Sequence, residues 1–217
     1  LVEHEFSLGD VPLHVVEAGQ RYQVGPFEVA PVRVAHSIVE ASALAITTCA
    51  GTLVHTGDFT FDPDPPDGEP SDEARLQALG DAGVELLLSD STNVDVTERP
   101  GSERSVAGAL EPLIQAAEGA VFIAMFASNI QRLMLGGIAQ RADRKLCLLG
   151  RSLCTQVDVA SAIGRLAWPS DLRASPEQAQ SLPRERLLVL AGGSQAEPGS
   201  AMARLAAGTH QHLAGEP

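Results

Sequence analysis

The sequence of 217 residues lacks the features of secreted and membrane-spanning proteins. No apolar run approaches the roughly 18 residues that a membrane-spanning helix needs. The first residues are charged and interrupted by glycine and proline, unlike a signal peptide. The few cysteines (Cys49, Cys147 and Cys154) form no CxxC pair, so we expect buried or half-buried free thiols in a reducing compartment. These absences predict a cytoplasmic protein without membrane association.

Basic residues are also scarce. Lysine and arginine number 15 against 28 aspartates and glutamates, which gives a formal net charge of −13. This balance excludes a generally basic nucleic-acid binder. It leaves room for a local cationic groove and for a bound metal ion, which would supply positive charge of its own.

The second half of the chain alternates between two patterns. Apolar runs of strand length occupy residues 120–126, 145–150 and 187–191, and each is followed by a segment of helical periodicity. Strands that alternate with helices predict an α/β fold with a parallel sheet flanked by helices on both faces. A proline-bearing segment, 165–186, is expected to be a connector.

The first half is richer in strands. Strands are predicted at 28–35, 43–48 and 52–55, and a buried strand at 84–89. Ser71 is predicted to N-cap a short helix. Because the rhythm changes near residue 100, we predict two domains, residues 1–100 and 101–217.

A histidine and an aspartate each follow a predicted strand of the first half, His36 after 28–35 and Asp58 after 52–55. Imidazole and carboxylate together suit zinc or manganese. The pair is therefore a candidate for half of a metal site. The alternatives are a structural histidine and a turn carboxylate, and the nearby His55 is expected to face elsewhere or to orient the turn.

Three other polar residues have two interpretations each. Asp90 ends the predicted strand 84–89, and it could orient a metal-ligating histidine or simply bind turn amides. His210 and His212 form an HxH pair that could bind metal. Their position after Gly208, which ends a predicted helix, favours a solvated loop.

Three strand–helix junctions of the second half place Ser128, Arg151 and Ser194 on one edge of the predicted parallel sheet. Free amides at helix N-termini attract phosphate, and arginine can clamp it with two hydrogen bonds. The three junctions therefore predict a site for a phosphate-rich ligand. The alternative is that each serine only caps its helix.

Several motifs together carry a family resemblance. Seven segments occur in the order and spacing of ribonuclease J, a metallo-β-lactamase-fold nuclease of the β-CASP group: AHSI (35–38), VHTGDFTFD (54–62), LLLSDSTN (86–93), SERSV (102–106), FASNIQR (126–132), LLGRS (148–152) and GGSQAEPGSA (192–201). The resemblance implies part of a metallo-β-lactamase αββα sandwich over residues 1–100. It implies a β-CASP domain, itself incomplete, over residues 101–217.

The resemblance also implies roles. His36 matches a motif whose histidine ligates one of two metal ions, and Asp58 matches the carboxylate that bridges both. Asp90 matches the acidic motif that begins the β-CASP signature, so Asp58 and Asp90 are the implied catalytic residues. RNA-phosphate contact is the implied role of a set in the second half (Ser128, Arg151 and Ser194).

The implied activity is metal-dependent hydrolysis of RNA in decay and maturation, both endonucleolytic and 5′-to-3′ exonucleolytic. The implied cofactor is a pair of zinc ions, with manganese as an alternative. RNA with a 5′-monophosphate end is the implied partner, and a homo-oligomer the implied assembly.

The sequence departs from the family pattern at several points. The HxHxDH run, which supplies most metal ligands, and the later histidine motifs are not found in it. Thr60 and Gln131 stand where the family often has lysine and histidine. We therefore expect the 217 residues alone to be inactive and to bind metal poorly. Two alternatives stay open: a non-catalytic RNA-binding or assembly module, and another metallo-β-lactamase-fold hydrolase acting on a small ester or thioester.

Overall fold

The computed structural model describes residues 10–97, 101–195, 197–211 and 213. The chain divides after Arg104 into two compact units, residues 8–104 and 105–217. The predicted boundary at residue 100 adjoins residues outside the described part of the chain. The assignment of residues 1–100 and 101–217 to two family domains stays a prediction.

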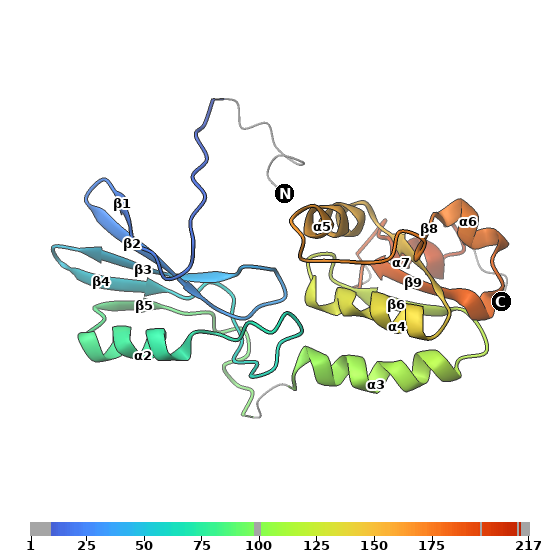
Figure 1. The fold of residues 1–217 in the computed structure, drawn as a ribbon, viewed down its shortest axis with the longest axis horizontal. Coiled ribbons are helices and arrows are strands. Elements are labelled where there is room, and N and C mark those ends of the chain that lie inside the picture. Colours follow the sequence, from blue (N-terminus) through green and yellow to red (C-terminus); the bar gives the residue numbers. More distant parts are fainter. Residues whose placement is uncertain (1–9, 98–100, 196, 212, 214–217) are drawn as a thin grey trace. The chain divides into compact units, whose positions relative to one another are not determined.

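The first unit is built on a mixed sheet with the order β1-β2-β3-β4-β5. The first four strands are antiparallel neighbours, and β5 runs parallel to β4. One helix, α2, lies beside this sheet (Figure 1). The elements are β1 (Tyr22–Val24), β2 (Phe27–Arg33), β3 (Ser42–Thr48), β4 (Gly51–His55), α2 (Glu73–Ala82) and β5 (Leu86–Leu88).

Alternation along β3 and β4 gives this sheet one buried face. Ala45 and Val54 are paired across the two strands and are buried, and Leu79 of α2 packs against them. The prediction of a buried strand at 84–89 is wrong in its burial, because β5 lies at one edge of the sheet. Leu86 and Leu88 are 49% and 43% exposed, respectively.

The cap of α2 also differs from the prediction. Asp72, not Ser71, is the N-cap, and its carboxylate accepts a hydrogen bond from the amide of Arg75. The Ser71 hydroxyl instead accepts from the amide of Ala35 and donates to the carbonyl of Thr60, both at 2.8 Å. Ser71 thus joins the segment after β2 to the loop that carries Asp58.

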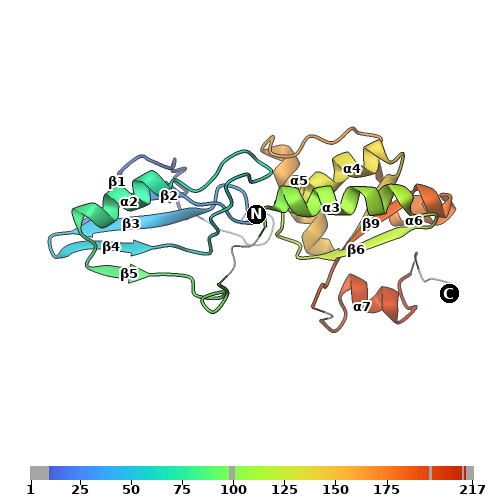
Figure 2. The ribbon, with the colours of Figure 1, turned by 90° about the horizontal axis from the view of Figure 1, so that it is seen from below.

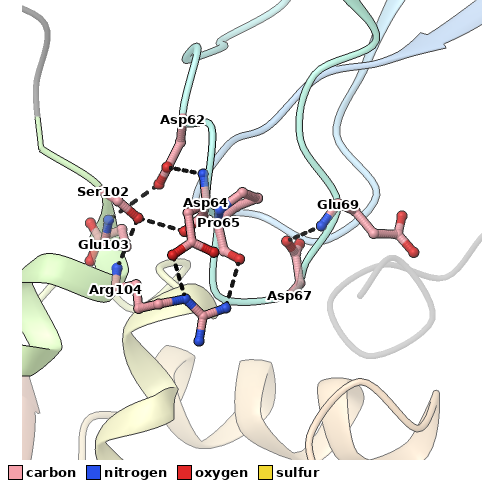
Figure 3. A network of polar contacts seen from close by, with 8 residues as sticks. All are labelled: Asp62, Asp64, Pro65, Asp67, Glu69, Ser102, Glu103 and Arg104. Atoms are coloured by element: carbon pink, nitrogen blue, oxygen red, sulfur yellow. Dashed lines mark hydrogen bonds and ion pairs between the residues drawn. The ribbon is translucent and has the colours of Figure 1, made fainter.

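Part of the acidic stretch after Asp58 is held by a polar network (Figure 3). Asp62, which is 7% exposed, accepts hydrogen bonds from the amides of Asp64 and Glu103. The Arg104 guanidinium pairs with the Asp64 carboxylate at 2.9 Å and donates to the carbonyl of Pro65. These carboxylates therefore satisfy amides and an arginine rather than forming a free anionic loop.

The second unit is built on a four-stranded sheet with the order β6-β9-β7-β8, all pairs parallel. This confirms the predicted parallel sheet flanked by helices. Its elements are α3 (Glu103–Ala116, whose first two residues belong to the first unit), β6 (Val121–Met125), the 3-10 helix η1 (Gln131–Met134), α4 (Leu135–Arg141), β7 (Lys145–Leu149), α5 (Arg151–Ala162), β8 (Arg173–Ala174), α6 (Pro176–Ser181), η2 (Arg184–Arg186), β9 (Leu187–Gly192) and α7 (Ala201–Ala206).

Helices cover both faces of this sheet. Residues of α6 and α7 pack in one core cluster with alternate residues of β7 and β9, among them Cys147, Val189 and Ala201. Figure 2 shows α3, α4 and α5 on the side of the sheet opposite α7. The predicted connector over 165–186 is wrong in part, because it contains β8, α6 and η2.

The structure also bears on membranes and thiols. Among the described residues, no helix is long and apolar enough to cross a membrane. All three cysteines are free. Burial raises the pKa of the Cys147 thiol to about 12, as expected for a core residue. Cys49 lies in the turn between β3 and β4 and is exposed, so the prediction of burial is wrong for this residue.

Replacement of two adjacent glycines of α4 by alanine should change the free energy of unfolding in opposite directions. A Cβ atom at Gly136 would lie 2.2 Å from Nε1 of Trp168, whereas at Gly137 the nearest atom, Nη1 of Arg141, lies at 3.4 Å. We expect Gly136→Ala to lower the free energy of unfolding by about 1–3 kcal/mol through overpacking. Gly137→Ala is expected to raise it by up to about 1 kcal/mol, because alanine favours the helix. Urea denaturation measures both, and equal effects would contradict the tight packing of Trp168 on α4.

Candidate functional site

His36 and Asp58 come together at one end of the first unit's sheet. An isolated antiparallel bridge joins Ala35 to Thr60, whose amide donates to the Ala35 carbonyl at 2.8 Å. This bridge brings Nε2 of His36 to 3.8 Å from Oδ2 of Asp58. The Asp58 side chain is 76% exposed and that of His36 27%, so both are accessible to a ligand.

Asp90 follows β5, and it lies close enough to His36 for the two side chains to interact electrostatically. Its Oδ1 atom accepts hydrogen bonds from the amide and the hydroxyl of Thr92, at 2.9 and 2.6 Å. These bonds, the hydroxyl foremost, hold the pKa of the Asp90 carboxyl below its usual value, with His36 as a smaller cause. Asp90 therefore binds its own turn, as one of the two sequence interpretations states, and its part in orienting His36 stays a prediction.

The donor set of this corner suits a divalent cation without completing a site for one. Imidazole and carboxylate are ordinary ligands of zinc and manganese. No group of three or more candidate ligands occurs among the residues that the structure describes. His36 and Asp58 thus supply part of a metal site and need further ligands.

His55 and His210 have structural roles. Nδ1 of His55 accepts a hydrogen bond from the amide of Gly57 at 3.0 Å, so His55 orients the turn that leads to Asp58. His210 is buried, with Nδ1 accepting from the amide of Leu213, and the predicted solvated loop is wrong for it. His212 lies outside the described residues.

A hollow opens at the carboxyl ends of β6, β7 and β9. It has a volume of about 740 Å³, and both Ser128 and Arg151 line it. Ser194 is not among the lining residues, although Gly192 and Gly193 are. The structure thus brings two of the three predicted phosphate-binding residues to one place.

The walls of this hollow depend on glycine. Gly150 has φ +120° and caps α5 without a side chain, which leaves the first turn of α5 facing the hollow. Gly193 has φ +102°, and a Cβ atom there would lie 2.3 Å from the Ser200 hydroxyl. That hydroxyl caps α7 through the amide of Ala203, so Ser194 does not cap this helix. Open amides and small residues allow an anion to approach the backbone.

Sequence reasoning missed Arg204, on α7. Arg151 and Arg204 both line the hollow, and no hydrogen bond or ion pair joins either guanidinium to a described residue. Several other arginines of this unit have fixed partners, such as Arg141 with Glu111 and Arg173 with Asp158. Two guanidinium groups that have no partner among the described residues outnumber the one carboxylate of this hollow, Glu197, and therefore favour an anionic ligand.

Comparison with known proteins supports the resemblance. A family model, described as the β-CASP domain of ribonuclease J, matches residues 118–217. The chain is similar to ribonuclease J of Sinorhizobium meliloti, with 40% identity over 93% of this chain and 36% of that protein. It is also similar to ribonuclease J of Helicobacter pylori and of Mycobacterium tuberculosis, each 37% identical, over 94% and 91% of this chain and 30% and 36% of those proteins.

A solved structure shows the fold alone. It is a protein of unknown function from Enterococcus faecalis, with a TM-score of 0.56 and 18% identity over 82% of this chain and 44% of that one. The predicted α/β fold with a β-CASP domain is confirmed. Residues 118–217 match the β-CASP domain of the ribonuclease J family, and the chain spans about a third of the length of the curated relatives that it matches.

Proposed function

We propose that the chain is part of a metal-dependent ribonuclease that hydrolyses phosphodiester bonds of RNA, both internally and from a 5′-monophosphate end. The observation that carries the proposal is the approach of His36 to Asp58, 3.8 Å apart in a chain 37–40% identical to ribonucleases J. Residues outside this chain would complete the metal site and the assembly, which we propose to be a homo-oligomer in the cytoplasm.

The residues of the first unit have separate roles in this proposal. His36 and Asp58 would hold zinc or manganese, which when bound supplies an activated water and polarises the scissile phosphate. Asp90 would position the corner, because its carboxylate binds the amide and hydroxyl of Thr92 and so holds the turn after β5 beside His36. Asp90 N–H donates to the hydroxyl of Thr56, which fixes the ends of β4 and β5 together.

The second unit would bind the substrate strand. Arg151, Ser128 and the open first turn of α5 can each contact a phosphate oxygen. We propose Ser194 as a further contact, made by a phosphate beyond the hollow. Two arginines against one glutamate, Glu197, give this hollow a net positive charge, and the excess of acid on the rest of the chain would direct RNA to it.

The test is a nuclease assay on single-stranded, 5′-monophosphorylated RNA. A protein of full ribonuclease J length that carries this chain should release mononucleotides and internal fragments with zinc or manganese, and EDTA should abolish both. The 217-residue chain alone should bind the RNA without cleaving it. Binding without cleavage by the longer protein, with either metal, would favour a non-catalytic module, and hydrolysis of thioesters alone would favour another hydrolase.

A further inference from the structure

A second hollow adjoins the first one in residues 105–217. Its volume is about 500 Å³, within the range of about 300–1,000 Å³ that small-molecule sites occupy. Gly150, Arg151 and Arg204 line both hollows. The two spaces therefore meet at Arg151 and Arg204, neither of which has a side-chain partner among the described residues.

The walls of the second hollow are apolar and polar, and they include one carboxylate, that of Glu177. Leu148, Cys154 and Pro176 supply apolar surface, against which a flat ring can pack. Thr209 and Gln211 supply a hydroxyl and an amide, and an amide both donates and accepts hydrogen bonds. This combination suits a nucleoside, which has an apolar ring face and polar edges, better than a bare inorganic anion.

The arginines fix where the phosphate of such a ligand would lie. A guanidinium donates two parallel hydrogen bonds to phosphate, and two of them from separate helices would enclose one phosphate group. Arg151 begins α5 and Arg204 lies on α7, so neither depends on the other's helix for its place. Single-stranded RNA is recognised through bases that turn out of the stack into such pockets.

We infer that the second hollow is a nucleotide-binding subsite, in which Arg151 and Arg204 hold one phosphate of the RNA strand and the attached nucleoside fills the space beside Gln211. The inference rests on the proposed function, because it assigns the strand a path from the first hollow into the second. It adds Arg204 as a substrate-binding residue and gives the second hollow a ligand.

The test is a titration of the ¹⁵N-labelled 217-residue chain with adenosine 5′-monophosphate, and separately with inorganic phosphate. We expect the nucleotide to shift the backbone amides of Thr209 and Gln211 and to bind at least about fivefold more tightly than phosphate, a difference of about 1 kcal/mol. Arg204→Gln should weaken nucleotide binding at least about fivefold. Arg184→Gln is the matched control, because Arg184 is also exposed and unpaired among the described residues but lines neither hollow.

The salt dependence of binding to single-stranded RNA tests the same two variants, Arg204→Gln and Arg184→Gln, independently. Removing one phosphate contact should reduce the slope of log affinity against log salt by about 0.7, so Arg204→Gln should show this reduction and Arg184→Gln should not. Amide shifts caused equally by phosphate and nucleotide, or unchanged affinity in Arg204→Gln, would overturn the subsite. Nucleotide binding at Thr209 and Gln211 in a protein that never cleaves RNA would keep the subsite and refute the ribonuclease.

Discussion

Asp58→Asn should reduce RNA hydrolysis by about a thousandfold or more, in a protein of full ribonuclease J length that carries this chain. A thousandfold loss corresponds to about 4 kcal/mol at the transition state. The amide keeps the size of the side chain but removes the negative charge that a divalent cation needs from its ligand. Because Asp58 is 76% exposed and holds no core residue, the fold should not change.

Rates on 5′-monophosphorylated RNA at saturating zinc or manganese, together with the metal content of the protein, measure this effect. Asp95→Asn is the control, because Asp95 is an exposed carboxylate of the segment after Asp90 and should leave the rate unchanged. Loss of activity with full metal content would move Asp58 from metal binding to another step. Retained activity would remove it from the site.

Arg144→Met should lower the free energy of unfolding by about 3 kcal/mol. The Arg144 side chain is 4% exposed, and its guanidinium donates to the carbonyls of Gly119 and Leu187, at 2.8 and 3.1 Å, and of Ala117. Methionine fills a similar volume but leaves these carbonyls without their donor, and each buried unsatisfied acceptor costs about 1–3 kcal/mol. Removal of a buried charge offsets part of that loss.

Thermal unfolding followed by circular dichroism measures this change, and about 3 kcal/mol should lower the Tm by more than about 10 °C in a unit of this size. Arg184→Met provides the comparison at an exposed site and should stay within about 0.5 kcal/mol of the parent. Equal Tm values for the two variants would show that the carbonyls around Arg144 find water instead.

The sequence predicts the second unit better than the first. Each strand of its parallel sheet is a continuous apolar run between helices, and β6, β7 and β9 lie where those runs predict them. The helix α6 is not predicted, because the prolines of 165–186 favour a connector. The signal for it is present, since Ser175 and Gln178 form a capping box around Pro176. The exposure of β5 could not be predicted, because an apolar strand is the same in sequence at an edge and at the centre of a sheet.

The candidate site, too, could be predicted only in part from the sequence. Strand ends predict where His36, Asp58 and Asp90 lie along the sheet, but the bridge between Ala35 and Thr60 that joins the first two is a tertiary contact. Arg204 has no local pattern that separates it from a solvated helix residue. Arg204 becomes a candidate only in the folded chain, where α7 places it beside Arg151 at the ends of β7 and β9. The two arginines are about 50 residues apart in sequence.

The strand order β6-β9-β7-β8 has a consequence for synthesis on the ribosome. The strand between β6 and β7 is β9, which is the last of the four to be made. Until Leu187–Gly192 leaves the exit tunnel, β6 lacks the strand with which it pairs, and its apolar side chains stay exposed to solvent. At about 5–20 residues per second, the roughly 60 residues between them take several seconds to appear. Folding of this unit is therefore a late, nearly all-or-none event in translation, and the nascent chain before it is a natural client for chaperones.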